Sequence, residues 1–128
     1  MIYGIGSDIV AIERIRNLLK KYGDAFARRI LSTDEWPAYQ SSHRPANLLA
    51  KRFAAKEAFA KALGTGLRHP VSLQNISVTH NHLGKPDFSL NPELAKILEE
   101  QGIQKHHLSL SDENEMACAF VILETSCQ

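Results

Sequence analysis

The sequence has few cysteines and almost no net charge, and each shortage excludes a class of protein. Its 128 residues include only two cysteines, Cys118 and Cys127, too few for a disulfide framework. We therefore expect reduced thiols and a cytoplasmic location, with Cys118 buried because it lies in an apolar run. Lysine and arginine number 15 against 14 aspartate and glutamate, a net charge of +1. That balance argues against nucleic-acid binding through bulk charge.

Long apolar runs are also missing. The longest, from Met116 to Leu123, is too short to cross a bilayer. The first residues carry no basic stretch and Asp8 interrupts their apolar pattern, so we expect no signal peptide and no membrane association. The hydrophobic fraction of 44% can supply one core, and the length predicts a single domain over residues 1–128.

The order of the expected elements indicates an α+β fold. Periodicity and capping signals predict strands at 2–10, 74–80, 87–90, 107–112 and 116–124, and helices at 12–22, 24–31, 46–63 and 92–101. A further short helix should begin at the capping box from Ser32 to Glu35. Because strands and helices do not alternate as βαβ units, we expect a mostly antiparallel sheet packed against a long central helix.

The first strand carries a carboxylate on an almost bare face. Gly4, Gly6, Asp8 and Val10 alternate onto one side, where backbone or a ligand can approach closely. A carboxylate there is costly unless it is used. The alternative is that Asp8 caps the following helix, although no capping box supports it.

The long helix at 46–63 is apolar nearly all round, yet it carries four charges. Arg52 and Lys56 share one side, and Glu57 and Lys61 share another, roughly 140° away. Charges on a buried helix must be paired or bind a ligand. From spacing alone, ordinary ion pairs such as Glu57 with Lys61 are the commoner explanation.

A second explanation combines the two elements into a phosphoryl-transfer site. Asp8 and Glu57 could share one Mg²⁺, a cation that typically takes one or two carboxylates together with phosphate oxygens. The nearby cations would bind further phosphate oxygens; they are Arg44, Arg52, Lys56 and Lys61. This combination is typical of phosphoryl transfer, in which the protein performs little covalent chemistry.

Residues 4–15 read GIGSDIVAIERI and residues 52–64 read RFAAKEAFAKALG. These two segments resemble the signatures of holo-[acyl-carrier-protein] synthases, in the 4′-phosphopantetheinyl transferase superfamily. The resemblance also includes RILS at 29–32 and GKP at 84–86, and it extends over essentially the whole chain. It implies transfer of 4′-phosphopantetheine from coenzyme A to a serine of apo-acyl carrier protein, releasing adenosine 3′,5′-bisphosphate, for fatty acid biosynthesis.

The resemblance also assigns roles. It implies that Asp8 and Glu57 bind Mg²⁺ and that Lys61 contacts the transferring phosphate, with a carboxylate-oriented water or a metal-bound hydroxide taking the serine proton. Coenzyme A binding would fall to Arg44, Arg52, Lys56 and Gly64. Members of the family commonly form homotrimers with active sites between subunits.

Carrier proteins are acidic, so a basic surface is expected to dock them. Arg14 lies in the first signature and is our candidate contact, whereas Arg16 and Arg28 fit a solvated helix face. The chain departs from the commoner family pattern at 109–112, which reads SLSD where many members end in histidine. A carboxylate repels phosphate, so Asp112 is left with a sugar contact, an adenine contact or a role in the hairpin turn with Asn114.

Three other functions remain open on the sequence. A non-catalytic module that binds coenzyme A or an acidic carrier would need the cations but not Asp8 and Glu57. A Mg²⁺-dependent hydrolase of pyrophosphates would act without a carrier. A purely structural trimer would need neither motif.

Overall fold

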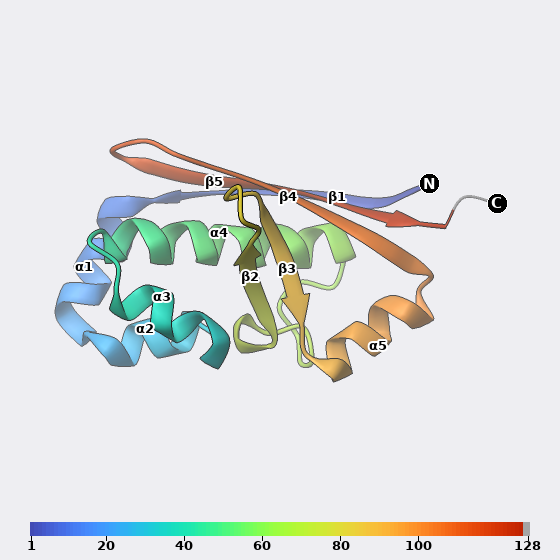
Figure 1. The fold of residues 1–128 in the computed structure, drawn as a ribbon, viewed down its shortest axis with the longest axis horizontal. Helices are drawn as coiled ribbons and strands as arrows, with labels where there is room; N and C mark the ends of the chain where they lie inside the picture. The colour runs from blue at the N-terminus through green and yellow to red at the C-terminus, as the bar shows by residue number, and fades with distance from the viewer. Residues whose placement is uncertain (127–128) are drawn as a thin grey trace.

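The computed structural model describes residues 1–126 and confirms the α+β class. A three-stranded antiparallel sheet lies along one side, the long helix α4 runs beneath it, and the remaining helices and a two-stranded sheet pack on the other side of α4 (Figure 1). The strands are β1 (Ile2–Ala11), β2 (Ile76–His80), β3 (Pro86–Leu90), β4 (Ile103–Asp112) and β5 (Met116–Thr125). The helices are α1 (Ile12–Tyr22), α2 (Asp24–Ile30), α3 (Trp36–Gln40), α4 (Pro45–Leu63) and α5 (Pro92–Glu100).

The local capping signals explain where several elements begin. The Asn91 side chain accepts a hydrogen bond from the backbone N–H of Leu94 and so begins α5. The capping box between Ser32 and Glu35 is present, and it begins a single 3₁₀ turn (Thr33–Glu35) that continues into α3. Proline at the start of α3 lacks a backbone donor, which the first turn of a helix does not need.

Strand β1 pairs with β5, and β5 pairs with β4, in the order β1-β5-β4. The bare face of β1 lies directly on α4. A Cβ on Gly4 would stand 1.9 Å from the carbonyl oxygen of Ala62, and one on Gly6 would stand 2.0 Å from that of Ala58. Backbone, rather than a ligand, therefore occupies this part of the face, and the alanines of α4 allow the approach.

Helix α4 forms the centre of the core, as the absence of a polar face predicts. Phe59 is fully buried, and Val121 and Leu123 of β5 are equally buried against the helix. Two charged side chains of α4, Arg52 and Lys56, are buried with them.

Four expectations require correction. Cys118 is exposed rather than buried, because alternation along β5 directs Ala117 and Ala119 toward α4 and Cys118 outward. The strand expected at 74–80 begins at Ile76, after a 3₁₀ turn, and β4 begins four residues earlier than expected. Strands β2 and β3 form a separate sheet. Cys127 lies outside the described residues, and no described helix has the length and apolar character to cross a membrane.

Candidate active site

The structure brings together one residue from each of the two signature segments, 4–15 and 52–64. The Nζ ammonium of Lys61, on α4, lies 3.1 Å from Oδ1 of Asp8 and 3.0 Å from the backbone carbonyl oxygen of Ser7. The Asp8 side chain is 16% exposed and that of Lys61 is 53% exposed. The ammonium of Lys61 is therefore open to solvent beside the contact between β1 and α4, and a ligand can reach it. Ala11, and not Asp8, is the N-cap residue of α1, and it makes no side-chain cap.

Glu57 is the second carboxylate of the predicted pair, and it lies one helical turn before Lys61 on α4. Burial raises the pKa of Glu57, and the negative charge of Asp8 raises it further, while Lys61 acts in the opposite direction. A cation held between the two carboxylates would relieve that repulsion. Among residues 1–126 there is no group of three or more histidine, cysteine or acidic side chains arranged around a metal position. Two carboxylates and open positions fit Mg²⁺, which keeps water and phosphate oxygens as its other ligands.

A depression of about 470 Å³ on the outer face of the sheet begins at these residues. Asp8 and Lys61 contribute to its lining, together with Phe120, Ser109 and Ser111. Polar donors and an exposed aromatic ring around a charged pair form a surface that can bind an extended ligand.

A buried ion network lies on the other side of α4. Glu35 accepts hydrogen bonds from Nη1 of Arg52 at 2.9 Å and from Nζ of Lys56 at 2.5 Å. The Lys56 ammonium also donates to the backbone carbonyls of Ile30 and Leu73, and its side chain is fully buried. This network connects the turn before α3 to the centre of α4.

Glu35 is held in its ionised form within the network. Burial by itself would raise the pKa of this carboxyl, but the Lys56 charge and hydrogen bonds from Lys56 and from the backbone N–H groups of Ser32 and Val78 outweigh burial and lower the pKa. The structure thus directs Lys56 to an internal carboxylate, and a ligand phosphate would have to displace that contact to reach the ammonium.

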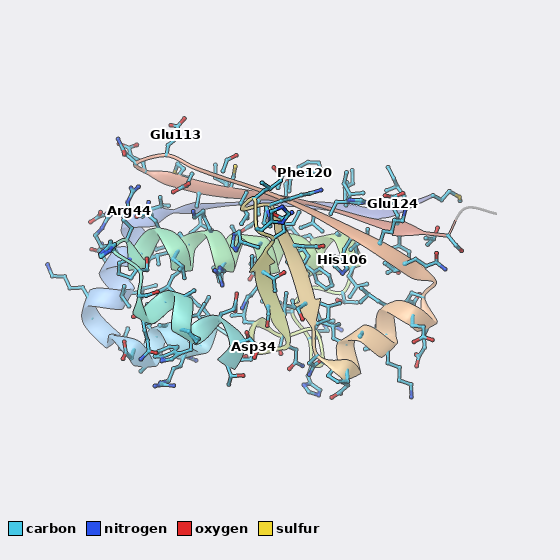
Figure 2. All side chains as sticks on the ribbon, in the orientation of Figure 1. Asp34, Arg44, His106, Glu113, Phe120 and Glu124 are labelled. Atoms are coloured by element: carbon cyan, nitrogen blue, oxygen red, sulfur yellow. The ribbon has the colours of Figure 1, made fainter. Side chains whose placement is uncertain are left out.

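A second, basic pocket of about 230 Å³ opens at the first half of α4. Its titratable lining residues are Arg44, Lys51, Arg52, His80 and Asp112. Arg44 is at the exposed N-cap of α4 (Figure 2) and forms no ion pair with residues 1–126. Burial lowers the pKa of His80, and the nearby charges of Arg52 and Lys51 add to this effect. These side chains give the pocket the character of an anion site.

Two further predicted residues lie apart from both pockets. Gly64 ends α4 in the left-handed conformation with φ of 88°, which favours glycine. Arg14, on α1, lines a mainly apolar pocket of about 300 Å³ together with Arg29, Leu18, Phe26 and Phe53. An apolar pocket between two arginines is suited to an amphipathic, acidic partner.

Sequence reasoning missed several residues at these positions. Glu35 was recognised only as half of a capping box, whereas its second carboxylate oxygen pairs with Arg52. Lys51 and Asn47 follow Arg44 at helical spacing, a signal that the sequence does contain. His80 has no local signal, because only the packing of β2 brings it to the pocket.

The chain matches known proteins over almost its whole length. A family model described as "4′-phosphopantetheinyl transferase superfamily" matches residues 4–121. A holo-[acyl-carrier-protein] synthase of Nitrosospira multiformis is 63% identical over 124 residues, which cover 97% of this chain and 99% of that protein. The crystal structure of the Neisseria meningitidis holo-[acyl-carrier-protein] synthase has a TM-score of 0.94 at 56% identity and covers 98% of this chain and 100% of its own.

A structure with bound ligand is also similar. The Bacillus anthracis holo-(acyl-carrier-protein) synthase, in complex with CoA (3′,5′-ADP), has a TM-score of 0.81 at 38% identity; the match covers 98% of this chain and 99% of that one.

Proposed function

The chain belongs to the 4′-phosphopantetheinyl transferase superfamily and is a phosphopantetheinyl transferase of the holo-[acyl-carrier-protein] synthase family, and on this premise we propose its Mg²⁺-dependent reaction and the roles of its residues. The substrate is coenzyme A, which relatives from Bacillus anthracis and Helicobacter pylori bind. The acceptor is a serine of apo-acyl carrier protein. We place the reaction in the cytoplasm, in fatty acid biosynthesis.

The serine hydroxyl oxygen of the carrier attacks the phosphorus that bears the pantetheine group. The bond from this phosphorus to the oxygen of the adenosine 3′,5′-bisphosphate breaks, and that oxygen leaves with the electron pair. The hydroxyl proton passes to water or to a carboxylate at the site. No side chain of this chain needs to act as the nucleophile, because the partner supplies it.

Asp8 and Glu57 would hold Mg²⁺ through carboxylate oxygens. The bound cation supplies charge neutralisation at the diphosphate of coenzyme A. Lys61 already lies 3.1 Å from Asp8, and its exposed ammonium can turn to a phosphate oxygen as negative charge develops there. The contact between Lys61 and Asp8, with Glu57 one helical turn before Lys61 on α4, is the observation that supports the proposal.

The basic pocket supports coenzyme A binding by Arg44 and Arg52. Gly64 lies apart from that pocket, and its backbone N–H donates to the carbonyl oxygen of Lys61, so any contact with coenzyme A would be at the Lys61 end of α4. Lys56 contributes by holding Glu35 and thus the position of Arg52. This role for Lys56 is indirect, and it replaces the direct phosphate contact that the resemblance implies.

Arg14 is the proposed carrier contact. Its position at the rim of an apolar pocket would let it pair with an acidic side chain while apolar side chains of the carrier enter the pocket. Charge of this kind mainly raises the rate of encounter and fixes orientation.

A homotrimer would cover the outer face of the sheet. Ile5 and Ile9 are 58% and 65% exposed there, and Phe120 is 47% exposed. Apolar side chains gathered on one sheet face favour burial against further copies of the chain.

The proposed function is tested by mass spectrometry of apo-acyl carrier protein incubated with this protein, coenzyme A and Mg²⁺. We expect a gain of one phosphopantetheine on the carrier serine, absent when EDTA is added. Coenzyme A bound without a mass gain would point to a binding module instead. Coenzyme A cleaved without a carrier would point to a hydrolase.

A further inference from the structure

One carboxylate lies in a pocket that otherwise gathers positive side chains. Within the described part of the chain, Asp112 is the single acidic residue lining the basic pocket, beside Arg44, Lys51, Arg52 and His80. A site built only to hold phosphate gains nothing from a carboxylate, which repels the ligand. At that point the pocket therefore favours a neutral hydrogen-bond donor of the ligand over a phosphate.

The Asp112 side chain is turned toward the helix and away from the hairpin turn. Its Oδ1 lies 3.7 Å from Nζ of Lys51, and its Oδ2 accepts a hydrogen bond from Nδ2 of Asn47 at 3.3 Å. The side chain is 25% exposed, so it can still reach a ligand. No hydrogen bond joins it to Asn114 within residues 1–126, which argues against the turn role.

The contacts of Asp112 place it between two cationic positions along α4. Arg44 and Arg52 are eight residues apart, which corresponds to about 12 Å along the axis. Asp112 meets the helix at Asn47 and Lys51, which lie between the two arginines. Asp112, from β4, therefore lies beside Lys51 and between the two arginines along the helix axis.

We propose that Asp112 determines nucleotide specificity by accepting a hydrogen bond from the ribose 2′-hydroxyl of coenzyme A, while the cationic side chains of the same pocket bind the neighbouring 3′-phosphate. This inference rests on the proposed function. In a 3′,5′-bisphosphorylated nucleoside the 2′-hydroxyl is the one free hydroxyl of the ring, and it lies on the carbon next to the one that bears the 3′-phosphate. A carboxylate accepts a hydrogen bond from a neutral hydroxyl strongly and rejects a further anion.

The test compares two nucleotides that differ only in that hydroxyl. Calorimetry gives the dissociation constants of adenosine 3′,5′-bisphosphate and 2′-deoxyadenosine 3′,5′-bisphosphate for the full chain, for Asp112→Ala and for Glu113→Ala. We expect the unmodified protein to prefer the ribonucleotide by roughly tenfold or more, and Asp112→Ala to lose that preference. Glu113→Ala removes a neighbouring exposed carboxylate at the tip of the hairpin (Figure 2) and should keep it.

Other results would overturn the inference. An equal preference in the full chain and in Asp112→Ala would show that the carboxylate does not contact the hydroxyl. If Asp112→Ala lowered the dissociation constants of both nucleotides by the same factor, Asp112 would only reduce the positive charge of the pocket. Asp112→Asn, which keeps the shape and an acceptor oxygen, should retain part of the preference and serves if the alanine variant fails to fold.

The two proposals fail in distinguishable ways. A protein that transfers phosphopantetheine but does not discriminate between the nucleotides retains its proposed function and loses this inference. A protein that discriminates between them but leaves apo-acyl carrier protein unmodified retains the inference as a binding property. Binding of neither nucleotide overturns the inference outright.

Discussion

The ammonium of Lys61 lies 3.1 Å from the carboxylate of Asp8, across a contact that two glycines make possible. Strand β1 reaches α4 closely enough for this pair because Gly4 and Gly6 place bare backbone against Ala58 and Ala62. The glycine spacing in the first signature and the alanines of the second signature therefore act together. They allow the close packing that brings a carboxylate of the strand to the charged residues of the helix.

Adding a methyl group at Gly6 should separate these elements. In Gly6→Ala the new Cβ would meet backbone at 2.0 Å and 2.7 Å, so the strand must shift. We expect the free energy of unfolding to fall by about 1–3 kcal/mol or more, as for overpacked cores, and transfer to fall with it. Urea denaturation measures the first effect. Ser7→Ala, on the exposed face of the same strand, is the control, and an equal loss there would contradict the explanation.

Removing either carboxylate of the active site should abolish transfer while leaving the fold intact. Asp8→Ala and Glu57→Ala each delete a proposed Mg²⁺ ligand, and we expect transfer to fall by at least about 100-fold. Neither side chain belongs to the hydrophobic core, so thermal unfolding should change little. Mass spectrometry of the carrier gives the activity. A variant that unfolds would show that the carboxylate is structural.

The buried carboxylate Glu35 should control stability in acid. Glu35→Gln leaves Arg52 and Lys56 without a counter-charge, and we expect a loss of about 3–5 kcal/mol at neutral pH. Because the fold lowers the pKa of Glu35, its stabilisation is complete above the ordinary pKa of 4.5 and disappears as pH falls through the folded-state pKa. The difference between the two proteins should therefore shrink in acid.

Urea denaturation at neutral and acidic pH tests this dependence. Asp34→Asn changes the exposed carboxylate next in sequence and should have a small effect at both pH values. A difference between the original protein and Glu35→Gln that stays constant with pH would show that the loss comes from packing.

The sequence predicted the α+β class and the long buried helix, because each has a local signal. Spacing favoured Glu57 as the ion-pair partner of Lys61, whereas the structure pairs Lys61 with Asp8. Helical spacing also placed Arg52 and Lys56 on one side of α4, and both do reach Glu35. Spacing could not show what they meet, since Glu35 arrives from a turn 17 and 21 residues away. Nor could it show that Cys118 faces outward, because a run of apolar residues does not reveal which face α4 covers.

Reversing the charge of Arg14 should weaken carrier binding selectively. Arg14→Glu places a negative charge at the rim of the apolar pocket on α1, where it would repel an acidic carrier. We expect carrier affinity to fall by at least about tenfold, with the affinity for coenzyme A unchanged, because the basic pocket lies elsewhere on the chain. Surface-immobilised apo-acyl carrier protein and calorimetry with coenzyme A measure the two quantities. Arg16→Glu, whose arginine pairs with Glu13, is the matched control.

Disrupting the apolar sheet face should change the oligomeric state. Phe120→Asp places a charge among Ile5, Ile9 and their neighbours, at a position that is 47% exposed in the single chain. Because the substituted side chain already reaches solvent, the subunit should keep its fold while the contact between copies weakens. Analytical ultracentrifugation should show a trimer for the original chain and smaller species for the variant. Since Phe120 lines the depression beside Asp8, transfer should fall together with assembly. A monomeric original chain with full transfer activity would show instead that one subunit holds a complete active site.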